Sequence, residues 1–169
     1  MQFEQMKALL AHNAERIRLL VEGVSQEQAQ WKPDTDSWSI LEVVNHLYDE
    51  EREDFRVRLD YILHRPGEDP PPIDPGGWVT QRRYNQRSLT QSLADFLVER
   101  RDSLVWLDSL ENPDWEAGYE APWGTIRAGD MFADWVAHDQ LHMRQFIELQ
   151  RAYLLQLAGA YDVRYAGEW

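Results

Sequence analysis

The segment Asp134-Trp-Val-Ala-His138-Asp-Gln-Leu-His142-Met-Arg-Gln145 decides the fold. It lies inside a longer stretch, residues 128–158, whose apolar side chains recur at helical spacing, and this stretch predicts one long helix. Its two histidines stand four residues apart, so both imidazoles leave the same helix face, with Cβ atoms about 5–6 Å apart. Two ring nitrogens at that separation can reach one metal ion.

Three further amphipathic stretches predict helices, and they cover residues 3–22, 39–64 and 89–110. No alternating pattern persists long enough to predict a sheet, although residues 161–169 can form an extended tail. Four long helices around one core make a four-helix bundle. We therefore expect an all-α protein, with residues 1–169 forming a single domain.

The second predicted helix has clear start and stop signals. Ser39-Ile-Leu-Glu42 is a candidate capping box, with Trp38 and Val43 placed as its hydrophobic staple. Arg65-Pro66 ends the helix. The following segment, residues 65–87, is rich in proline and glycine and predicts a long irregular loop between helices 2 and 3. Loops of this length inside a compact domain often have a function.

The composition excludes several classes of protein. The formal net charge of −13 disfavours a nucleic-acid groove or an anionic membrane surface, since both require a basic footprint. No apolar run approaches the ~20 residues of a membrane span, and no signal-peptide pattern opens the chain. Because the chain has no cysteine, disulfides and cysteine-ligated metal sites are excluded. We expect a cytoplasmic protein without membrane or nucleic-acid partners.

A third histidine strengthens the case for a metal. His46 lies on the second predicted helix, three residues after Val43, at the flank of the apolar stripe, so it can project toward His138 and His142. Three imidazoles that leave a coordination position open are typical of a catalytic metal site. The alternative is a set of core histidines bonded to other helices, because a buried imidazole without a partner costs on the order of 1–3 kcal/mol.

The other two histidines, His12 and His64, have patterns typical of surface residues. Three carboxylates lie one turn from the predicted ligands and can accept a hydrogen bond from a ring N–H. Asp134 precedes His138, while Asp49 and Glu50 follow His46. Surface acidity is the simpler explanation for most of them, since 30 residues are Asp or Glu.

Two motifs together resemble a known family. The segment Trp31-Lys-Pro, followed by Ser37-Trp-Ser-Ile-Leu-Glu-Val-Val-Asn-His46-Leu, resembles the start of the second helix in DinB-like proteins. His138-Asp-Gln-Leu-His142-Met-Arg-Gln145 resembles their fourth-helix motif. The resemblance covers almost the whole chain. It implies a four-helix bundle that holds a divalent metal, zinc or nickel, through three histidines, here His46, His138 and His142.

The resemblance also implies a class of reaction. DinB-like proteins include thiol-dependent S-transferases and a mycothiol-dependent maleylpyruvate isomerase, and others are regarded as metal-dependent hydrolases. We therefore predict a metal-dependent enzyme that acts on a small-molecule substrate with a low-molecular-weight thiol, or else hydrolyses its substrate. The family often pairs, so a homodimer is expected. No general acid or base can be identified from the residues.

Two other functions compete with this prediction. His138-Asp139-x-x-His142 mimics the His-Glu-x-x-His motif of zinc peptidases, with Asp139 in place of the usual glutamate base. Against it, no histidine follows His142 to supply a downstream third ligand. The second alternative is a non-catalytic dimeric binding protein that the metal only stabilises.

The surroundings of the site are less constrained by the sequence. Arg82, Arg83 and Arg87 form a basic cluster that can receive carboxylates of a thiol cofactor or an anionic substrate, although pairing with nearby acidic residues is the simpler expectation. The long loop can cover one end of the bundle, with Trp78 near the metal. Trp123-Gly124 can line the same end.

Overall fold

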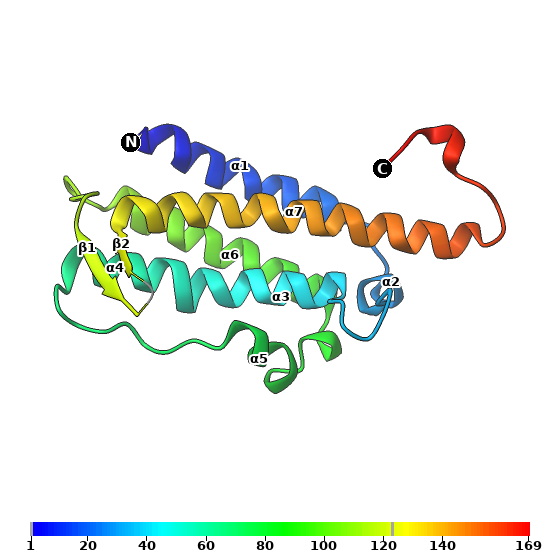
Figure 1. The fold of residues 1–169 in the computed structure, drawn as a ribbon, viewed down its shortest axis with the longest axis horizontal. Helices are drawn as coiled ribbons and strands as arrows, with labels where there is room; N and C mark the ends of the chain where they lie inside the picture. The colour runs from blue at the N-terminus through cyan, green and yellow to red at the C-terminus, as the bar shows by residue number, and fades with distance from the viewer. Residues whose placement is uncertain (1, 123) are drawn as a thin grey trace.

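Four long helical rods form the structure, a computed structural model that describes residues 2–122 and 124–169. The rods are α1 (Phe3–Val21), the continuous run of α3 (Ile40–Glu50), the π-helical turn η1 (Glu51–Phe55) and α4 (Arg56–His64), then α6 (Leu89–Asp108) and α7 (Ala128–Ala158) (Figure 1). The predicted all-α four-helix bundle is confirmed. Among the described residues, no helix is long and apolar enough to cross a membrane.

The directions of the rods explain why the connection between α4 and α6 is long. In Figure 1, α1 and α7 run one way along the bundle, while the α3–α4 rod and α6 run the other way. Because α4 ends at the opposite end of the bundle from the start of α6, residues 65–88 must travel back along its length. The segment therefore lies along the side of the bundle, with α5 packed on α3, rather than over one end.

The same segment is more ordered than predicted. It contains a short helix, α5 (Pro75–Gln81), and a 3-10 turn, η2 (Tyr84–Gln86). Asp74 caps α5 by accepting a hydrogen bond from the Gly77 amide at 3.0 Å, and Pro75 occupies the first turn, where no amide donor is needed. The long loop between the second and third rods is confirmed, but it is not irregular throughout, because proline and glycine also mark helix ends.

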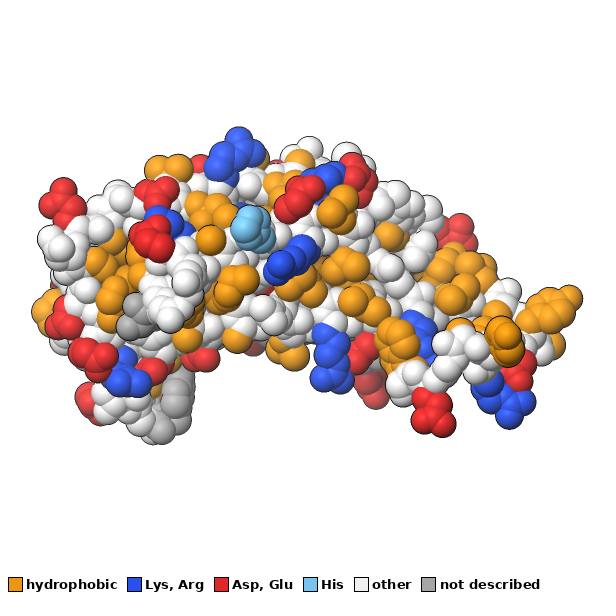
Figure 2. Space-filling view, turned by 90° about the horizontal axis from the view of Figure 1, so that it is seen from above, with side chains coloured by type: hydrophobic (Ala, Val, Ile, Leu, Met, Phe, Trp, Pro, Cys, Tyr) orange, Lys and Arg blue, Asp and Glu red, His pale blue; other side chains and the backbone are white. Residues whose placement is uncertain are grey.

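The remaining elements are small. The sequence patterns did not predict α2 (Gln26–Gln30) or the antiparallel hairpin of β1 (Gly118–Ala121) and β2 (Gly124–Arg127), which joins α6 to α7. The tail contains a 3-10 turn, η3 (Arg164–Ala166), where an extended segment was expected. The last turns of α7 project beyond the other rods, and apolar side chains are exposed at that end of the molecule (Figures 1 and 2).

A buried polar layer separates the two larger apolar clusters of the interior. Ile17 of α1 and Phe96 of α6 belong to one cluster, whereas Leu10 and Leu107 of the same two helices belong to the other. The polar layer lies between them and includes one buried residue from each rod: Asn13, Glu51, Arg100 and Asp139. The three histidines of the predicted metal site lie near this polar layer: His46 precedes Glu51 on the α3–η1 rod, and His138 and His142 flank Asp139 on α7.

Arg100 holds the polar layer together. Its guanidinium donates to both carboxylate oxygens of Glu51, at 2.7 and 2.8 Å, and to both of Asp139, each at 2.8 Å. It also donates to the carbonyl of Leu10 at 3.0 Å. Since Arg100 is 1% exposed, these bonds replace the water that its charge would otherwise require. One side chain of α6 thus connects α1, the α3 rod and α7.

Candidate metal centre

Helix capping sets the position of His46. The Ser39 hydroxyl accepts a hydrogen bond from the Glu42 amide at 3.1 Å, and the Ser39 amide donates to the Glu42 carboxylate at 2.9 Å. This reciprocal pair is the predicted capping box, and it starts α3 at Ile40. Trp38, just outside the helix, packs against the core, and its ring centroid lies 4.9 Å from that of His46. The start of the helix therefore also buttresses the imidazole.

The three histidines converge in space. Nε2 of His138 lies 3.2 Å from Nε2 of His46 and 3.1 Å from Nε2 of His142. One ring nitrogen from each residue lies within 4.8 Å of the other two. His46 and His142 are 5% and 6% exposed, while His138 is partly exposed. The structure thus brings together the residues that the sequence singled out, and their role as ligands stays a prediction.

Burial keeps these imidazoles neutral. Desolvation, followed by the proximity of His142, lowers the pKa of His46 to about 3. Desolvation is also the main cause that lowers the pKa of His138 to about 2, with smaller effects from the other two histidines and Arg100. The pKa of His142 is lowered by burial too. A neutral imidazole has a nitrogen lone pair available for a metal.

Two of the three nitrogen separations match those expected around a divalent ion. Zinc–nitrogen bonds of about 2.0–2.1 Å at tetrahedral angles place neighbouring ligand nitrogens about 3.3 Å apart. The two separations from Nε2 of His138, 3.1 and 3.2 Å, are close to that value, and the His46 and His142 nitrogens lie within 4.8 Å of each other. In the tautomer that leaves Nε2 unprotonated on all three rings, the lone pairs face one another, and a cation at their centre would stabilise the arrangement.

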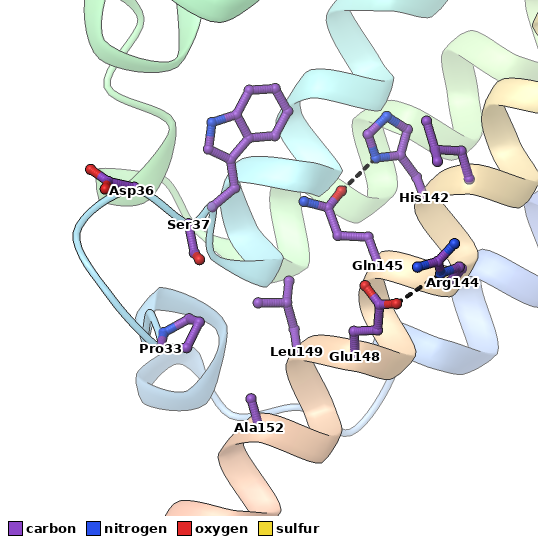
Figure 3. A pocket seen from close by; sticks show the side chains of 11 residues that line it. Pro33, Asp36, Ser37, His142, Arg144, Gln145, Glu148, Leu149 and Ala152 are labelled. Atoms are coloured by element: carbon purple, nitrogen blue, oxygen red, sulfur yellow. Dashed lines mark hydrogen bonds and ion pairs between the residues drawn. The ribbon is translucent and has the colours of Figure 1, made fainter. Parts of the chain in front are cut away.

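The outer nitrogens have different environments. Nδ1 of His142 donates to the Gln145 amide oxygen at 2.7 Å, an interaction drawn in Figure 3, and this bond leaves Nε2 unprotonated toward the centre. Nδ1 of His46 lies 3.8 Å from Oε1 of Glu50. These two atoms are the only buried side-chain polar atoms in the described chain that lack a hydrogen-bond partner. Burial, followed by a hydrogen bond with Asp54, raises the pKa of Glu50 to about 9.

Of the three carboxylates predicted to support the ligands, only Glu50 faces one of them. Asp49 instead accepts hydrogen bonds from the Tyr84 hydroxyl and from Arg52, the latter at 3.0 Å, and pairs with Arg82 at 2.7 Å. Asp134 is exposed on α7 and, within the described part of the chain, makes no hydrogen bond or ion pair with a histidine. The sequence could not separate these three because all lie one helical turn from a ligand.

Asp139 does not occupy the position of a peptidase base. Its side chain is buried, accepts two hydrogen bonds from Arg100, and accepts a third from the Asn13 amide at 3.2 Å. Both oxygens of this carboxylate are therefore occupied by donors from α1 and α6 and do not face a water beside the histidines. The geometry therefore gives no support to the zinc-peptidase alternative.

The other sequence candidates lie away from the histidines. His12 is exposed, and His64 is exposed beside Asp60, with Nδ1 2.8 Å from the carboxylate. Trp78 is buried in a small cluster with Val79 and Tyr84, which packs against Trp38. Trp38 thus lies between this cluster and His46. Trp123 lies outside the described residues.

The arginine cluster divides among different partners. Arg82 donates to both carboxylate oxygens of Glu53 at 2.8 Å, as the simpler expectation of pairing predicted. Arg87 donates to the Asn45 side-chain oxygen at 2.8 Å. Arg83 is exposed, with a left-handed backbone at φ 51°. The three guanidinium groups therefore do not form one anion site.

Two hollows are lined in part by α7, one on each side of the histidines along the helix. The first, which we call the Trp38 hollow, has a volume of about 700 Å³ and includes Trp38, His142, Gln145 and Leu149 in its lining (Figure 3). The second, the Asp134 hollow, has a volume of about 520 Å³. Its α7 residues, Met131 and Asp134, precede His138, so the order along the helix is Asp134 hollow, histidines, Trp38 hollow.

Some functional neighbours were missed at the sequence level. Gln145 is part of the fourth-helix motif, and its position three residues after His142 on a helix could have predicted contact between the two side chains. Arg100 follows Phe96 by one turn on the apolar side of its helix, and a charge at such a position signals a buried ion pair. No comparable signal indicated that Phe55 packs on His138, with ring centroids 5.0 Å apart.

Comparison with known proteins agrees with this geometry. The sequence profile of the DinB superfamily matches residues 9–146. The chain belongs to the DinB superfamily. Among solved structures it is similar to YfiT from Bacillus subtilis, with a TM-score of 0.78 and 20% sequence identity over 89% of this chain and 86% of that one. YfiT is described as a probable metal-dependent hydrolase with an unusual four-helix bundle topology. No functionally curated protein matches.

Proposed function

We propose that this DinB-superfamily protein is a metal-dependent enzyme whose divalent ion, zinc or nickel, is held by Nε2 of His46, His138 and His142. The observation that carries the proposal is the convergence of three neutral, mostly buried imidazole nitrogens on one point. An ion bound by three ligands keeps a position open, and its Lewis acidity lowers the pKa of a thiol or a water there.

The chain's own residues prepare the site for such a ligand. Gln145 fixes the tautomer of His142 through the 2.7 Å hydrogen bond, whereas Oε1 of Glu50 lies 3.8 Å from Nδ1 of His46, too far for a hydrogen bond. Trp38 and Phe55 place apolar rings against His46 and His138. These rings exclude water from the sides of the centre, which strengthens electrostatic interactions within it.

Transfer of a small thiol fits the surrounding carboxylates better than hydrolysis. Hydrolysis gains from a general base beside the attacking water. Here Asp139 is held by Arg100, Asp49 is held by Tyr84 and Arg82, and Glu50 faces the outer nitrogen of His46. A thiol ionises more readily than water and depends less on such a base. In the proposed step, the thiolate sulfur forms a bond to an electrophilic carbon, and the leaving group departs with the bonding electrons.

Hydrolysis is the second candidate, and the description of YfiT supports it. The two reactions can be separated with zinc-loaded protein. We expect faster conjugation of cysteine to 1-chloro-2,4-dinitrobenzene, with loss of that rate in His138→Ala and retention in the surface control His12→Ala. Hydrolysis of 4-nitrophenyl acetate that depends on His138, without any conjugation, would favour the second candidate.

The non-catalytic alternative predicts a different outcome. In that case zinc raises the melting temperature, while no thiol or ester substrate reacts faster with the loaded protein than with His138→Ala. Activity that follows metal occupancy across a zinc titration would exclude this alternative, because a purely stabilising ion has no effect on the reaction rate of an already folded protein.

A further inference from the structure

The Asp134 hollow has the features of a small-molecule site. It lies between α4, the start of α7, the β1–β2 hairpin and the proline segment 70–72. Tyr119 of the hairpin donates its hydroxyl to Asp69 at 2.8 Å, which fastens the hairpin to the segment that precedes the prolines. Its volume of about 520 Å³ is in the range of ligand pockets, roughly 300–1,000 Å³.

The walls of the hollow are mainly apolar and include flat rings. Phe55, Tyr61 and Tyr119 contribute aromatic rings, and Met131 and the three prolines add apolar surface. Aromatic and proline side chains present rigid faces, so a flat hydrophobic body binds them at little cost in side-chain entropy.

The charges in the lining leave one carboxylate without a partner. Asp54 and Arg58 pair with each other through a hydrogen bond from the guanidinium. Asp134 has no ion pair among the described residues, and its side chain is accessible from solvent. Desolvation, followed by the negative charge of Asp130, raises the pKa of Asp134, and a cation bound beside this carboxylate would favour its ionised form.

The hollow adjoins the histidines. Phe55 belongs to its lining, and the same ring lies with its centroid 5.0 Å from the His138 ring. Asp134 is one helical turn before His138 on α7. A molecule held in the hollow would therefore be separated from His138 by the Phe55 side chain.

We infer that the Asp134 hollow binds a small molecule with a flat apolar body and a positively charged amine, the body lying against the tyrosine and proline walls and the amine against Asp134. This inference rests on the proposed function in one respect: the amine is a substrate only if the protein is the proposed enzyme. Binding itself needs only the hollow and not the metal.

Three probes of similar shape and different charge test the inference: benzylamine, benzyl alcohol and benzoate. Their dissociation constants are measured by NMR titration of the full chain at pH 7.5, with and without zinc. We expect benzylamine to bind tightest, with a preference over benzoate of about tenfold or more. The preference should disappear in Asp134→Asn and persist in Asp102→Asn, a control at an exposed carboxylate of α6.

A second variant tests the location. Met131→Trp fills part of the hollow and should weaken the binding of all three probes. The amide signals of Tyr61 and Tyr119 should shift on titration of the wild-type protein and not of Met131→Trp. Equal affinity for benzoate and benzylamine, or no binding of any probe, would overturn the inference. Because the metal-free protein is measured as well, this failure is distinguishable from a failure of the histidines to bind zinc.

Discussion

Replacing Arg100 with methionine tests whether the buried polar layer holds the metal-binding helices together. Methionine preserves much of the apolar stem but removes the charge, so Glu51 and Asp139 lose their shared partner. Both carboxylates are 1% exposed, and methionine replaces none of the four hydrogen bonds that they receive from Arg100. The carbonyl of Leu10 loses a fifth bond.

The size of the effect follows from this geometry. Removing one member of a buried ion pair typically costs about 3–5 kcal/mol, because the remaining charge is left without solvent or partner. We expect a loss near the upper end of that range, since two carboxylates are affected. A domain of this kind has roughly 5–15 kcal/mol of stability, so a loss of this size removes about a third of it or more, and the variant should unfold at much lower urea concentration.

The assay is urea denaturation of metal-free protein at pH 7.5, followed by circular dichroism. Arg101→Met is the matched control, because Arg101 is exposed at the next position of α6, and a change within about 0.5 kcal/mol is expected there. The triple variant with Glu51→Gln and Asp139→Asn should regain about 2 kcal/mol, since neutral amides are cheaper to bury than charges. Equal stability of the Arg100 and Arg101 variants would refute the reasoning.

Three other perturbations have defined outcomes. The stability of metal-free protein should fall as pH drops below 6.5, the ordinary histidine value, by up to about 1.4 kcal/mol per pH unit for each of His46 and His138. The unfolded imidazoles take up protons in that range while the buried ones do not; His46→Gln should flatten the dependence of urea midpoints between pH 7.5 and 5.5. Ser39→Ala should cost about 0.5–2 kcal/mol in thermal unfolding by removing the α3 cap. Tyr84→Phe should cost about 1–3 kcal/mol in urea unfolding, since buried Asp49 loses a hydrogen-bond donor.

Helix positions were predictable because they depend on local pattern. The stretch 128–158 carries continuous apolar spacing, and α7 has those bounds. The capping box at Ser39 placed the start of α3 at the residue where the structure has it. The hairpin before α7 was missed because its strands have four residues each, too few for an alternating pattern to stand out.

The convergence of the histidines was predictable, whereas their environment was not. Spacing placed His138 and His142 on one face, and the flank position of His46 allowed it to meet them. Which acidic side chain faces a ligand depends on the path of the other helices: Glu50 lies against His46, and Asp139 faces Arg100 from α6. Such long-range pairs leave no trace in helical periodicity. The expected homodimer stays a prediction.

The central claim is that three histidines bind one divalent metal ion. The most direct test is metal analysis of purified protein after zinc loading and desalting, with calorimetric titration of the metal-free form. The account predicts about one zinc per chain, loss of that zinc in His138→Ala, and full retention in His12→Ala. A wild-type protein that binds no zinc or nickel, or a His138→Ala variant that binds it as tightly as wild type, would contradict the account.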